Sequence, residues 1–325
     1  MRAAYYEKNG PVREVLQVAE VETPQPGPGE VRVRLRTSGV NPSDVKSRLG
    51  TVRKIAFPRV IPQSDGAGEI DVVGQGVPQT RVGERVWVWN AQWKRAFGTA
   101  AEHVVLPAAQ AVTLPQSVSF EAGACLGIPA MTASHAVTLA EAEPGRTIFI
   151  SGGAGAVSHY AIQFAGQRGA TVIVTVSSPD KAKIATEAGA DHAIDYKRED
   201  VGARVKEIIG GRGADAMIEL DLTANARLIP AVLRPHGTVV VYGTMPEATI
   251  PAAFCLVNTI TLKFFLVYEL TPDERAAAIG EITRAIEENR LVHNVAKTFP
   301  FTEMAAAHEA VESGKVPGNI VVTIP

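Results

Sequence analysis

The fold of this 325-residue chain is decided by the stretch Arg146-Thr147-Ile148-Phe149-Ile150-Ser151-Gly152-Gly153-Ala154-Gly155-Ala156-Val157-Ser158. Its first five residues form a short apolar run typical of a buried strand, and the glycine-rich segment after them is typical of a tight turn. Beyond the turn, Val157, Tyr160, Ala161 and Phe164 recur at the spacing of one helix face. A strand, a glycine turn and a helix in this order are typical of a loop that binds the pyrophosphate of a dinucleotide.

Each part of this loop has a physical reason to hold phosphate. One glycine lets the chain turn sharply, another lets the backbone approach the phosphates, and the amino end of the helix offers free N–H groups and a partial positive charge. The alternative is a tight turn without a ligand. Ser158 stands where a third glycine often lies, which predicts a helix packed slightly farther from the sheet. The residues expected to contact the cofactor are Gly152, Ala154, Gly155, Ala156 and Val157.

Strands and helices alternate on both sides of this unit. A second strand is predicted at 171–176, followed by a helix at 178–188 with Ser178 as its cap and Pro179 at its first position. The pattern continues with a helix at 198–209, a strand at 215–220, a helix at 224–233 and a strand at 238–242. Such alternation predicts βαβ units and a parallel sheet.

The end of the second strand indicates which nicotinamide cofactor is bound. NAD-binding proteins usually place Asp or Glu here, where it holds the ribose hydroxyls. This chain has Ser177 and Ser178, with Lys181 a turn further on, while Asp180 is expected to face solvent. Hydroxyls and an ammonium favour a 2′-phosphate. We therefore expect NADPH, held by Ser177 and Lys181; the alternative for Lys181 is an ordinary solvated lysine.

The first 120 or so residues predict strands and turns instead. Residues 30–36 alternate apolar and charged side chains, and further strands are predicted at 68–73, 85–89 and 102–106. The pattern changes at about Glu121. After the parallel-sheet region, a strand is predicted at 261–270, helices at 272–289 and 302–313, and a strand at 319–324 that could return to complete the first module.

Composition excludes several classes of protein. Apolar residues make up 46% and charged residues 20%, and the formal net charge of -2 does not favour nucleic acid or an anionic membrane surface. No apolar stretch approaches the length of a membrane span, and the amino-terminal residues lack the apolar core of a signal peptide, so a cytoplasmic protein is expected. Cys125 and Cys255 have no paired spacing and are expected to be free, mostly buried thiols.

Three motifs resemble the medium-chain dehydrogenase/reductase superfamily: Ser38-Gly39-Val40-Asn41-Pro42-Ser43-Asp44, Gln63-Ser64-Asp65-Gly66-Ala67-Gly68 and Gly127-Ile128-Pro129-Ala130-Met131-Thr132-Ala133. The Asn-Pro form, the glycine loop and Ile218-Glu219-Leu220 with Ala224-Asn225 resemble most closely the zinc-free quinone oxidoreductases, the zeta-crystallin-like branch. The resemblance covers residues 1–325. It implies an α/β fold in which a GroES-like β-barrel catalytic domain at 1–122, completed by about 264–325, accompanies a Rossmann doubly wound parallel sheet at 123–263.

The metal positions of the zinc-dependent relatives are filled by other residue types. By resemblance these positions are Asn41, Ser64 and Ile128. Zinc at a catalytic site takes thiolate, imidazole or carboxylate donors, usually three from the protein. An amide, a hydroxyl and an alkyl group do not supply them, so no metal is expected. Reduction of a quinone or an activated C=C bond fits such a pocket, because an electron-poor acceptor needs chiefly to be positioned against the hydride donor.

The resemblance implies that Asn41 and Asp44 point toward the nicotinamide and the substrate. The alternatives are structural, because Asn-Pro is a turn signal and Ser43 or Asp44 could cap the short helix that runs through Leu49. Many members of the branch have Tyr where this chain has Lys46. That lysine could polarise a carbonyl, hold an anionic group or merely be solvated, which leaves the substrate class open.

Three tryptophans cluster at Trp87, Trp89 and Trp93. Alternation puts Trp87 and Trp89 on one strand face, so both are expected in the core. Trp93 lies beyond the strand and is the better candidate for a pocket wall that stacks on a planar quinone or enone.

The resemblance implies further cofactor contacts. Thr132 would meet the nicotinamide-side phosphate, Tyr196 the adenine side, Gly243 and the segment from Leu266 to Tyr268 the nicotinamide ring, and Asn319 a phosphate or ribose group. The strand at 261–270 resembles the edge strand through which these Rossmann domains pair into homodimers; the alternative is an ordinary internal strand.

Together these observations predict a zinc-independent, NADPH-dependent quinone oxidoreductase. One alternative is an NADPH-dependent reductase of α,β-unsaturated ketones or acids, which Lys46 favours. Another is a cofactor-binding protein with a structural or regulatory role. The identity of the quinone or enone, the number of electrons transferred and the proton donor are not determined by the sequence.

Overall fold

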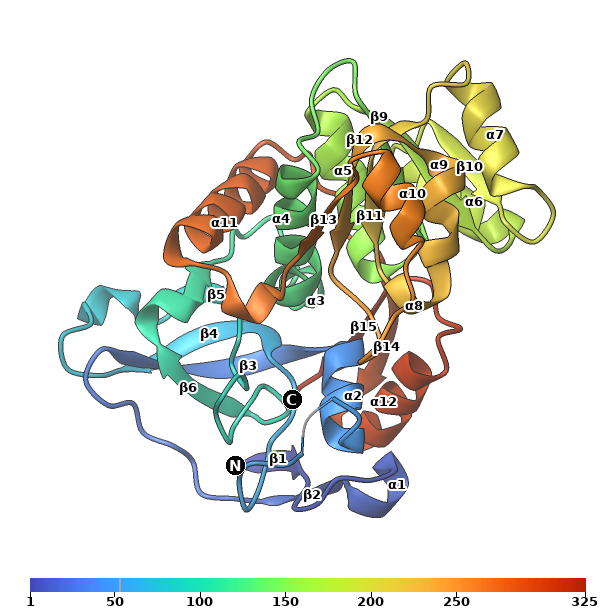
Figure 1. Ribbon diagram of the computed structural model, residues 1–325. Helices are drawn as coiled ribbons and strands as arrows, with labels where there is room; N and C mark the ends of the chain where they lie inside the picture. Colours follow the sequence, from blue (N-terminus) through green and yellow to red (C-terminus); the bar gives the residue numbers. More distant parts are fainter. Residues whose placement is uncertain (53) are drawn as a thin grey trace. The chain divides into compact units, whose positions relative to one another are not determined.

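The computed structural model describes residues 1–52 and 54–325. They form two compact units, the first from residues 1–128 and 293–325 and the second from residues 129–292. Each unit has its own sheet (Figure 1). The carboxyl-terminal tail thus returns to complete the first unit, as the sequence predicted.

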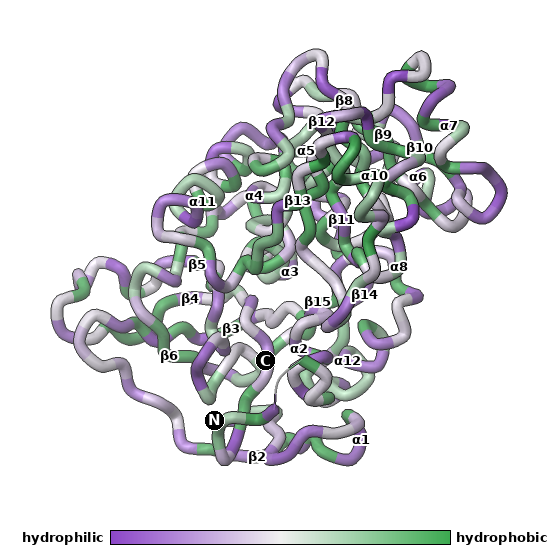
Figure 2. Tube along the Cα trace, viewed as in Figure 1, coloured by the Kyte–Doolittle hydropathy of each residue, from purple (hydrophilic) through white to green (hydrophobic). Residues whose placement is uncertain are grey.

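The second unit is built on a six-stranded parallel sheet in the order β10-β9-β8-β11-β12-β13. Its strands are β8 (Thr147–Ile150), β9 (Thr171–Val176), β10 (His192–Asp195), β11 (Ala214–Glu219), β12 (Leu233–Val241) and β13 (Thr261–Phe264). This is the doubly wound order, in which consecutive strands run outward from β8 in one direction and then in the other. In Figure 2 the central strands carry the hydrophobic colour expected of a sheet covered on both faces.

Helices connect these strands and cover the sheet. They are α4 (Met131–Leu139), α5 (Ala156–Gln167), α6 (Pro179–Glu187), α7 (Val201–Ile208), α8 (Leu222–Asn225), α9 (Ile229–Val232), α10 (Ala252–Val257) and α11 (Pro272–Glu287). Ser178 caps α6, where its hydroxyl accepts from the Lys181 N–H at 3.4 Å and Pro179 occupies the first turn. The predicted cap is therefore confirmed.

The structure corrects two predicted elements of this unit. The helix expected at 224–233 is broken into α8, a 3₁₀ turn and α9, and β12 already begins at Leu233. The strand expected at 261–270 ends at Phe264, and a 3₁₀ turn at Val267–Glu269 follows it. The Arg275 guanidinium holds this turn by donating to the carbonyls of Tyr268 and Leu270.

The unit boundaries also differ from the predicted ones at 122 and 263. The second unit runs to residue 292 because α11 packs against α4. A polar cluster fastens the two helices: Glu281 of α11 accepts from Arg168 at 2.8 Å and from the Ser134 hydroxyl of α4 at 2.5 Å. Sequence periodicity cannot predict this contact, because the partners lie more than a hundred residues apart in the chain.

The first unit contains a seven-stranded mixed sheet in the order β14-β15-β3-β4-β5-β7, with β6 also paired to β3. Its strands are β3 (Glu30–Val40), β4 (Asp65–Val73), β5 (Arg85–Val88), β6 (His103–Pro107), β7 (Ala111–Thr113), β14 (Val295–Pro300) and β15 (Asn319–Thr323). The pairing of β15 with β3 is antiparallel, from Ile320 opposite Val40 to Thr323 opposite Thr37. A separate hairpin joins β1 (Arg2–Tyr5) to β2 (Gln17–Glu20).

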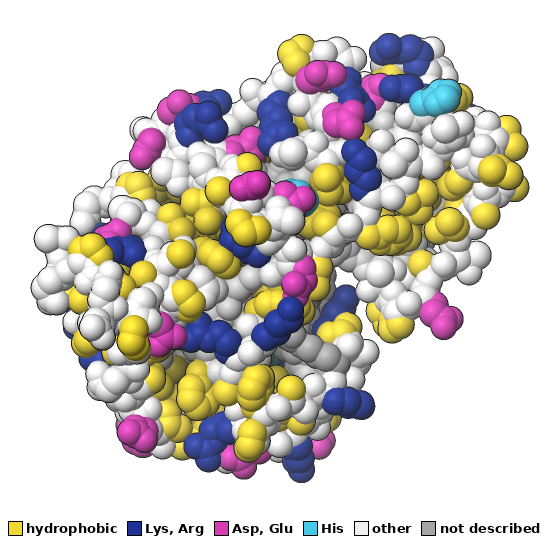
Figure 3. Space-filling model, turned by 60° about the vertical axis from the view of Figure 1, so that its left-hand side comes forward, with side chains coloured by type: hydrophobic (Ala, Val, Ile, Leu, Met, Phe, Trp, Pro, Cys, Tyr) yellow, Lys and Arg dark blue, Asp and Glu magenta, His cyan; other side chains and the backbone are white. Residues whose placement is uncertain are grey.

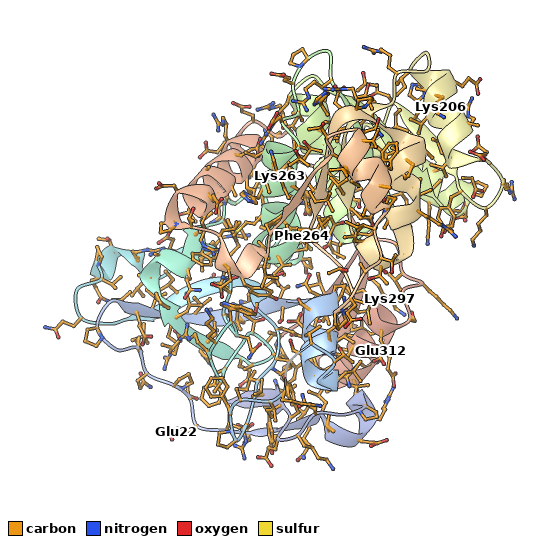
Figure 4. All side chains as sticks on the ribbon, viewed as in Figure 1. Glu22, Lys206, Lys263, Phe264, Lys297 and Glu312 are labelled. Atoms are coloured by element: carbon orange, nitrogen blue, oxygen red, sulfur yellow. The ribbon has the colours of Figure 1, made fainter. Side chains whose placement is uncertain are left out.

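The helices of this unit are short. They are α1 (Val12–Val15), α2 (Pro42–Leu49), α3 (Phe120–Gly123) and α12 (Met304–Glu312). An ion pair ties α2 to α12, because the fully buried Arg48 side chain donates at 2.8 Å to Glu312, whose side chain is 43% exposed; Figure 4 labels Glu312 on α12. Within the described ranges, no helix is long and apolar enough to cross a membrane.

Candidate active site

The glycine loop of the second unit lies at the switch point of its sheet. Strand β8 sits between β9 and β11, and the chain winds away from it in opposite directions. The loop at 151–155 leaves the carboxyl end of β8 and leads into α5. In doubly wound folds, ligands bind outside the carboxyl ends of the strands at this point.

The glycines of the loop have separate reasons to be glycine. Gly152 has a φ of +66°, a left-handed conformation that favours a residue without a side chain. A Cβ on Gly153 would lie 2.7 Å from Val174 of β9, so Gly153 allows the loop to approach the neighbouring strand. Gly155 caps α5, and a Cβ there would make a tight contact with the Gly152 carbonyl at 3.2 Å and an ordinary one with the Ser158 hydroxyl at 3.9 Å. The amino end of α5 therefore retains the N–H groups that phosphate needs.

Ser158 stabilises the loop rather than loosening it. Its hydroxyl donates to the Ser151 carbonyl at 2.9 Å, and the side chain is fully buried. The predicted extra distance between helix and sheet is therefore not required, because the small serine side chain forms a hydrogen bond in the space that a glycine would leave.

A buried carboxyl group underlies the same loop. Glu219, the last residue of β11, accepts from the Ser151 hydroxyl at 2.6 Å, from the Asp221 N–H at 2.6 Å and from the Asn225 amide at 2.9 Å. Burial raises the pKa of Glu219, and the hydrogen bonds from Ser151 and Asn225 oppose that shift. Glu219 thus joins the ends of the two strands that flank the switch point.

Thr132 has the property expected of a ligand-binding hydroxyl. It lies in the first turn of α4 and is 4% exposed, yet its Oγ1 has no hydrogen-bond partner among the described residues. A buried hydroxyl without a partner is costly, at about 1–3 kcal/mol. A phosphate oxygen would satisfy it, so the residues of this unit fit a dinucleotide.

The residues expected at the adenosine end lie on adjacent strands. Ser177 directly follows β9 and Tyr196 directly follows β10, and these strands pair in parallel with Val176 opposite Asp195. Tyr196 is 52% exposed and Ser177 is half-buried. Lys181 is half-buried on α6 and pairs with no acidic side chain of the described residues. Asp180 is exposed, as predicted.

The four remaining predicted cofactor residues differ in their surroundings. A Cβ on Gly243 would lie 1.9 Å from the Leu220 carbonyl, so close packing of the chain after β11 and β12 already requires glycine there. Tyr268 is buried, whereas Leu266 is 45% exposed. In the first unit, the Asn319 side chain donates to the Asn294 carbonyl at 3.1 Å.

A buried polar cluster in the first unit contains two of the three predicted catalytic residues, Asn41 and Asp44, but not Lys46. Asn41 caps α2, and its backbone N–H donates to the Asp44 carboxylate at 2.8 Å. The Asn41 amide donates to Asp65, the first residue of β4, at 2.7 Å. All three side chains of the cluster are at most 5% exposed. The capping role foreseen for Asp44 is therefore present, and Asn41 is fixed in one orientation.

Asp65 is the electrostatic centre of this cluster. Its side chain is completely buried. Burial, together with the nearby Asp44, raises the pKa of the Asp65 carboxyl well above its usual range, and the hydrogen bond from Asn41 opposes the shift. The Asp65 carboxyl therefore keeps its proton to a higher pH than an ordinary aspartic acid does.

The other predicted pocket residues divide between core and surface. Trp87 is 1% exposed, as predicted for a core residue. The same expectation is wrong for Trp89, which is half-buried because β5 ends at Val88 and no longer alternates the side chains. Trp93 and Lys46 are both half-buried.

Over residues 1–52 and 54–325, no group of three or more His, Cys, Asp or Glu side chains could hold a metal ion. Cys125 is buried and Cys255 is half-buried, and both are free thiols. Burial raises the pKa of the Cys125 thiol.

Two site residues were missed by sequence reasoning. Asp65 and Glu219 were quoted only as parts of motifs, yet both are fully buried carboxyl groups beside predicted site residues. The sequence offered only a weak indication of these two site residues, namely an acidic residue at the start or end of an otherwise apolar strand.

Comparison with known proteins shows the family to which the chain belongs. Residues 27–116 match the alcohol dehydrogenase GroES-like domain, and residues 156–284 match the zinc-binding dehydrogenase family. A quinone oxidoreductase of Pseudomonas aeruginosa is 30% identical over 318 residues, covering 95% of each chain. The chain belongs to the quinone oxidoreductase family. As a member of that family, within the medium-chain dehydrogenase/reductase superfamily, it is an oxidoreductase.

The names of other relatives of this quinone oxidoreductase-family chain mention different substrates and cofactors. A 2-haloacrylate reductase of a Burkholderia species is 29% identical over 336 residues, covering 99% of this chain and 98% of the relative. Escherichia coli quinone oxidoreductase complexed with NADPH superposes with a TM-score of 0.87 at 25% identity, and an NAD-dependent alcohol dehydrogenase with a TM-score of 0.91 at 29% identity. Both superpositions cover all of both chains.

Proposed function

We propose that this chain is a zinc-independent NADPH:quinone oxidoreductase. The observation that carries the proposal is the glycine loop at the switch point, with the unpartnered Thr132 hydroxyl in the same unit and Ser177 and Lys181 where NAD-binding proteins carry an acid. The relatives named quinone oxidoreductase, and the Escherichia coli structure complexed with NADPH, support this choice.

The second unit supplies the residues that hold the cofactor. The N–H groups of Ala156 and Val157 at the start of α5, together with the Thr132 hydroxyl, would bind the pyrophosphate. Lys181 and Ser177 would bind the 2′-phosphate, and Tyr196 would lie against the adenine. Ala154 would line the loop, and Gly243, Leu266 and Tyr268 would line the nicotinamide end. When bound, NADPH supplies a hydride from C4 of its nicotinamide ring.

The first unit supplies the residues that hold the acceptor. Asn41 has its amide fixed by Asp65, so its side chain meets the acceptor in one orientation. Asp44 fixes the backbone of Asn41, and Lys46 is available for a carbonyl oxygen. Trp93 is proposed as a wall, and Asn319 as a further polar contact to the cofactor. Because the acceptor is electron-poor, holding it correctly accounts for much of the rate.

We propose that catalysis uses no zinc because the donor types are wrong. The amide of Asn41, the hydroxyl of Ser64 and the alkyl side chain of Ile128 stand where the zinc-dependent relatives place their ligands. None of them is a thiolate, an imidazole or a carboxylate. Asp65 and the nearby Asp44 offer carboxyl groups, but in the part of the chain described here they belong to no group of three His, Cys, Asp or Glu side chains that could hold a metal ion.

A second candidate function is the reduction of α,β-unsaturated ketones or acids. Lys46 favours it, because an ammonium can polarise a carbonyl or hold a carboxylate, and the resemblance to a 2-haloacrylate reductase supports it. We further propose that the protein is a cytoplasmic homodimer that binds neither nucleic acid nor membrane.

The experiment that tests the proposal is a panel of acceptors. Oxidation of NADPH and of NADH is followed by absorbance with quinones, 2-enones, 2-enoic acids and alcohols, before and after treatment with a chelator. We expect quinone reduction with NADPH preferred over NADH, unchanged by the chelator. Stoichiometric zinc in active protein, or activity confined to alcohols, would contradict the proposal.

A further inference from the structure

The first unit contains a cavity of about 260 Å³ beside α2. Its lining includes Ser47 of α2 and, from the loop that follows β5, Gln92 and Lys94. Residues 54–57 and 60 and Tyr6 complete the described lining.

One lining element, α2, also carries Asn41 and Asp44 of the polar cluster. Ser47 is six residues beyond Asn41 on α2, or about 9 Å along the helix axis at 1.5 Å per residue. In another lining segment, the Ala91 N–H donates to the Ser64 carbonyl at 3.1 Å, so the loop carrying Gln92 is fastened next to Asp65. The cavity therefore lies between helix α2 and a loop fastened to the segment before β4.

The interior of the cavity is apolar and includes aromatic rings. Tyr6 and Val60 are buried in one small hydrophobic cluster, and Ile55 and Phe57 pack against it. Two of these four residues are aromatic, which suits a flat, short hydrocarbon body. The volume is small for a drug-sized ligand, whose pockets measure about 300–1,000 Å³.

The charged side chains in the described lining of the cavity are all basic. Lys54 and Lys94 both line it, and none of the described lining residues is Asp or Glu. Lys94 Nζ lies 5.6 Å from the centroid of the Trp93 ring, which links the lysine to the predicted pocket wall. Lys54 is exposed and pairs with no acidic side chain of the described residues. A neutral quinone has no group that needs two ammonium ions, whereas a carboxylate does.

We propose that this cavity binds a small α,β-unsaturated carboxylate, with its hydrocarbon part against Tyr6 and Phe57 and its carboxylate toward Lys54 and Lys94. This inference rests on the proposed reductase function and specifies the class of its acceptor. Lys54 and Lys94 are then specificity-determining residues, which bind the acid and leave neutral acceptors unaffected.

The test compares a 2-enoic acid with the 2-enone in which a methyl ketone replaces the carboxylate, and with a quinone. Its variant is Lys54→Met/Lys94→Met, which keeps the stems and removes both charges. We expect kcat/KM for the acid to fall by roughly 10- to 100-fold, the loss of one or two charge-assisted hydrogen bonds. Values for the enone and the quinone are expected to stay within about 2-fold.

Two matched controls accompany this variant. Lys54→Arg/Lys94→Arg keeps the charges and is expected to retain acid reduction. Lys206→Met removes an exposed lysine of α7 in the second unit, which Figure 4 labels, and is expected to change nothing. A readout without turnover is calorimetric binding of the saturated carboxylate, which we expect in the unmodified protein and not in the Met variant.

The possible failures are distinguishable. If quinone and enone are reduced but the acid neither binds nor reacts, or if the Met variant loses all three acceptors equally, this inference is overturned and the reductase function stands. If NADPH is oxidised with none of the acceptors while the saturated acid still binds through the lysines, the proposed reductase function is overturned instead.

Discussion

At the scale of single residues, cofactor choice depends on the side chains that follow β9. An acid at this position would repel a 2′-phosphate, and the chain has Ser177, Ser178 and Lys181 instead. In the structure, Ser178 is occupied as the cap of α6, which leaves Ser177 and Lys181 for a ligand.

Replacement of Lys181 by alanine tests this assignment. We expect Lys181→Ala to weaken NADPH binding by roughly 1.5–3 kcal/mol, the size of a charge-assisted hydrogen bond, and to leave NADH nearly unchanged. Dissociation constants for both cofactors, measured by fluorescence titration, check it. Lys183→Ala is the control, because Lys183 lies on the same helix and pairs with Glu187 at 3.8 Å. Equal losses for the two cofactors would defeat the assignment.

Asp65 makes stability depend on pH. Its pKa is raised in the folded state, chiefly by burial, so the unfolded chain releases this proton at a lower pH than the folded chain does. Stability from this group is therefore lost as pH rises from about 3.9, the ordinary value for Asp, toward the raised folded value.

The variant Asp65→Asn removes this ionisation and keeps an oxygen for the Asn41 amide. We expect it to unfold at a higher temperature or urea concentration than the unmodified protein at pH 7, with the difference shrinking toward pH 4. The control is Asp180→Asn, at an exposed position. It is expected to change neither the stability at pH 7 nor the dependence of stability on pH. A variant less stable at pH 7 than at pH 4, relative to the unmodified protein, would show that Asp65 is ionised in the folded state.

At the scale of elements, local patterns predicted most strands and helices of both units. The alternation at 30–36 identified β3, and the apolar run before the glycines identified β8. Prediction failed where tertiary contacts or proline override local preference: Pro230 restarts a helix as α9, and Arg275 binds the turn that ends β13. Strand β14 was not predicted, because it is an edge strand with mostly exposed side chains and little alternation.

The residues of the candidate site likewise fall into those that the sequence predicted and those that it did not. The glycine loop, Thr132 and Lys181 were found from the sequence because their chemistry resides in residue type and spacing. Asp65 and Glu219 were not singled out, because only burial distinguishes them from ordinary acidic residues.

At the scale of the whole molecule, the second unit presents a sheet edge with apolar side chains. Among the described strands β13 pairs only with β12, and its residue Phe264, which Figure 4 labels, is 60% exposed. Leu256 and Val257, at the end of α10 just before it, are 82% and 81% exposed. Apolar side chains gather in patches between charged ones on the face shown in Figure 3. An exposed apolar sheet edge is a place for another chain to pair.

We predict that the protein is a homodimer in solution and that Phe264→Lys makes it monomeric, because a buried lysine without a partner opposes association. Light scattering after size-exclusion chromatography measures the mass. Val18→Lys, at another exposed apolar residue, on β2 of the first unit, is the control and is expected to leave the dimer intact. A monomeric unmodified protein, or a dimeric Phe264→Lys variant, would refute the prediction.

The sequence by itself determined the strand–glycine–helix unit, the parallel sheet around it, the missing acid after the second strand and the absence of zinc donors at three motif positions. These features are local, since backbone freedom, side-chain spacing and donor chemistry belong to residues near one another in the chain. Only the tertiary structure placed Asp65 against Asn41, Glu219 beneath the glycine loop, and Lys54 and Lys94 around a cavity also lined by Tyr6. The physical reason is that burial and proximity set a pKa and shape a cavity, and both depend on which distant segments the fold brings together.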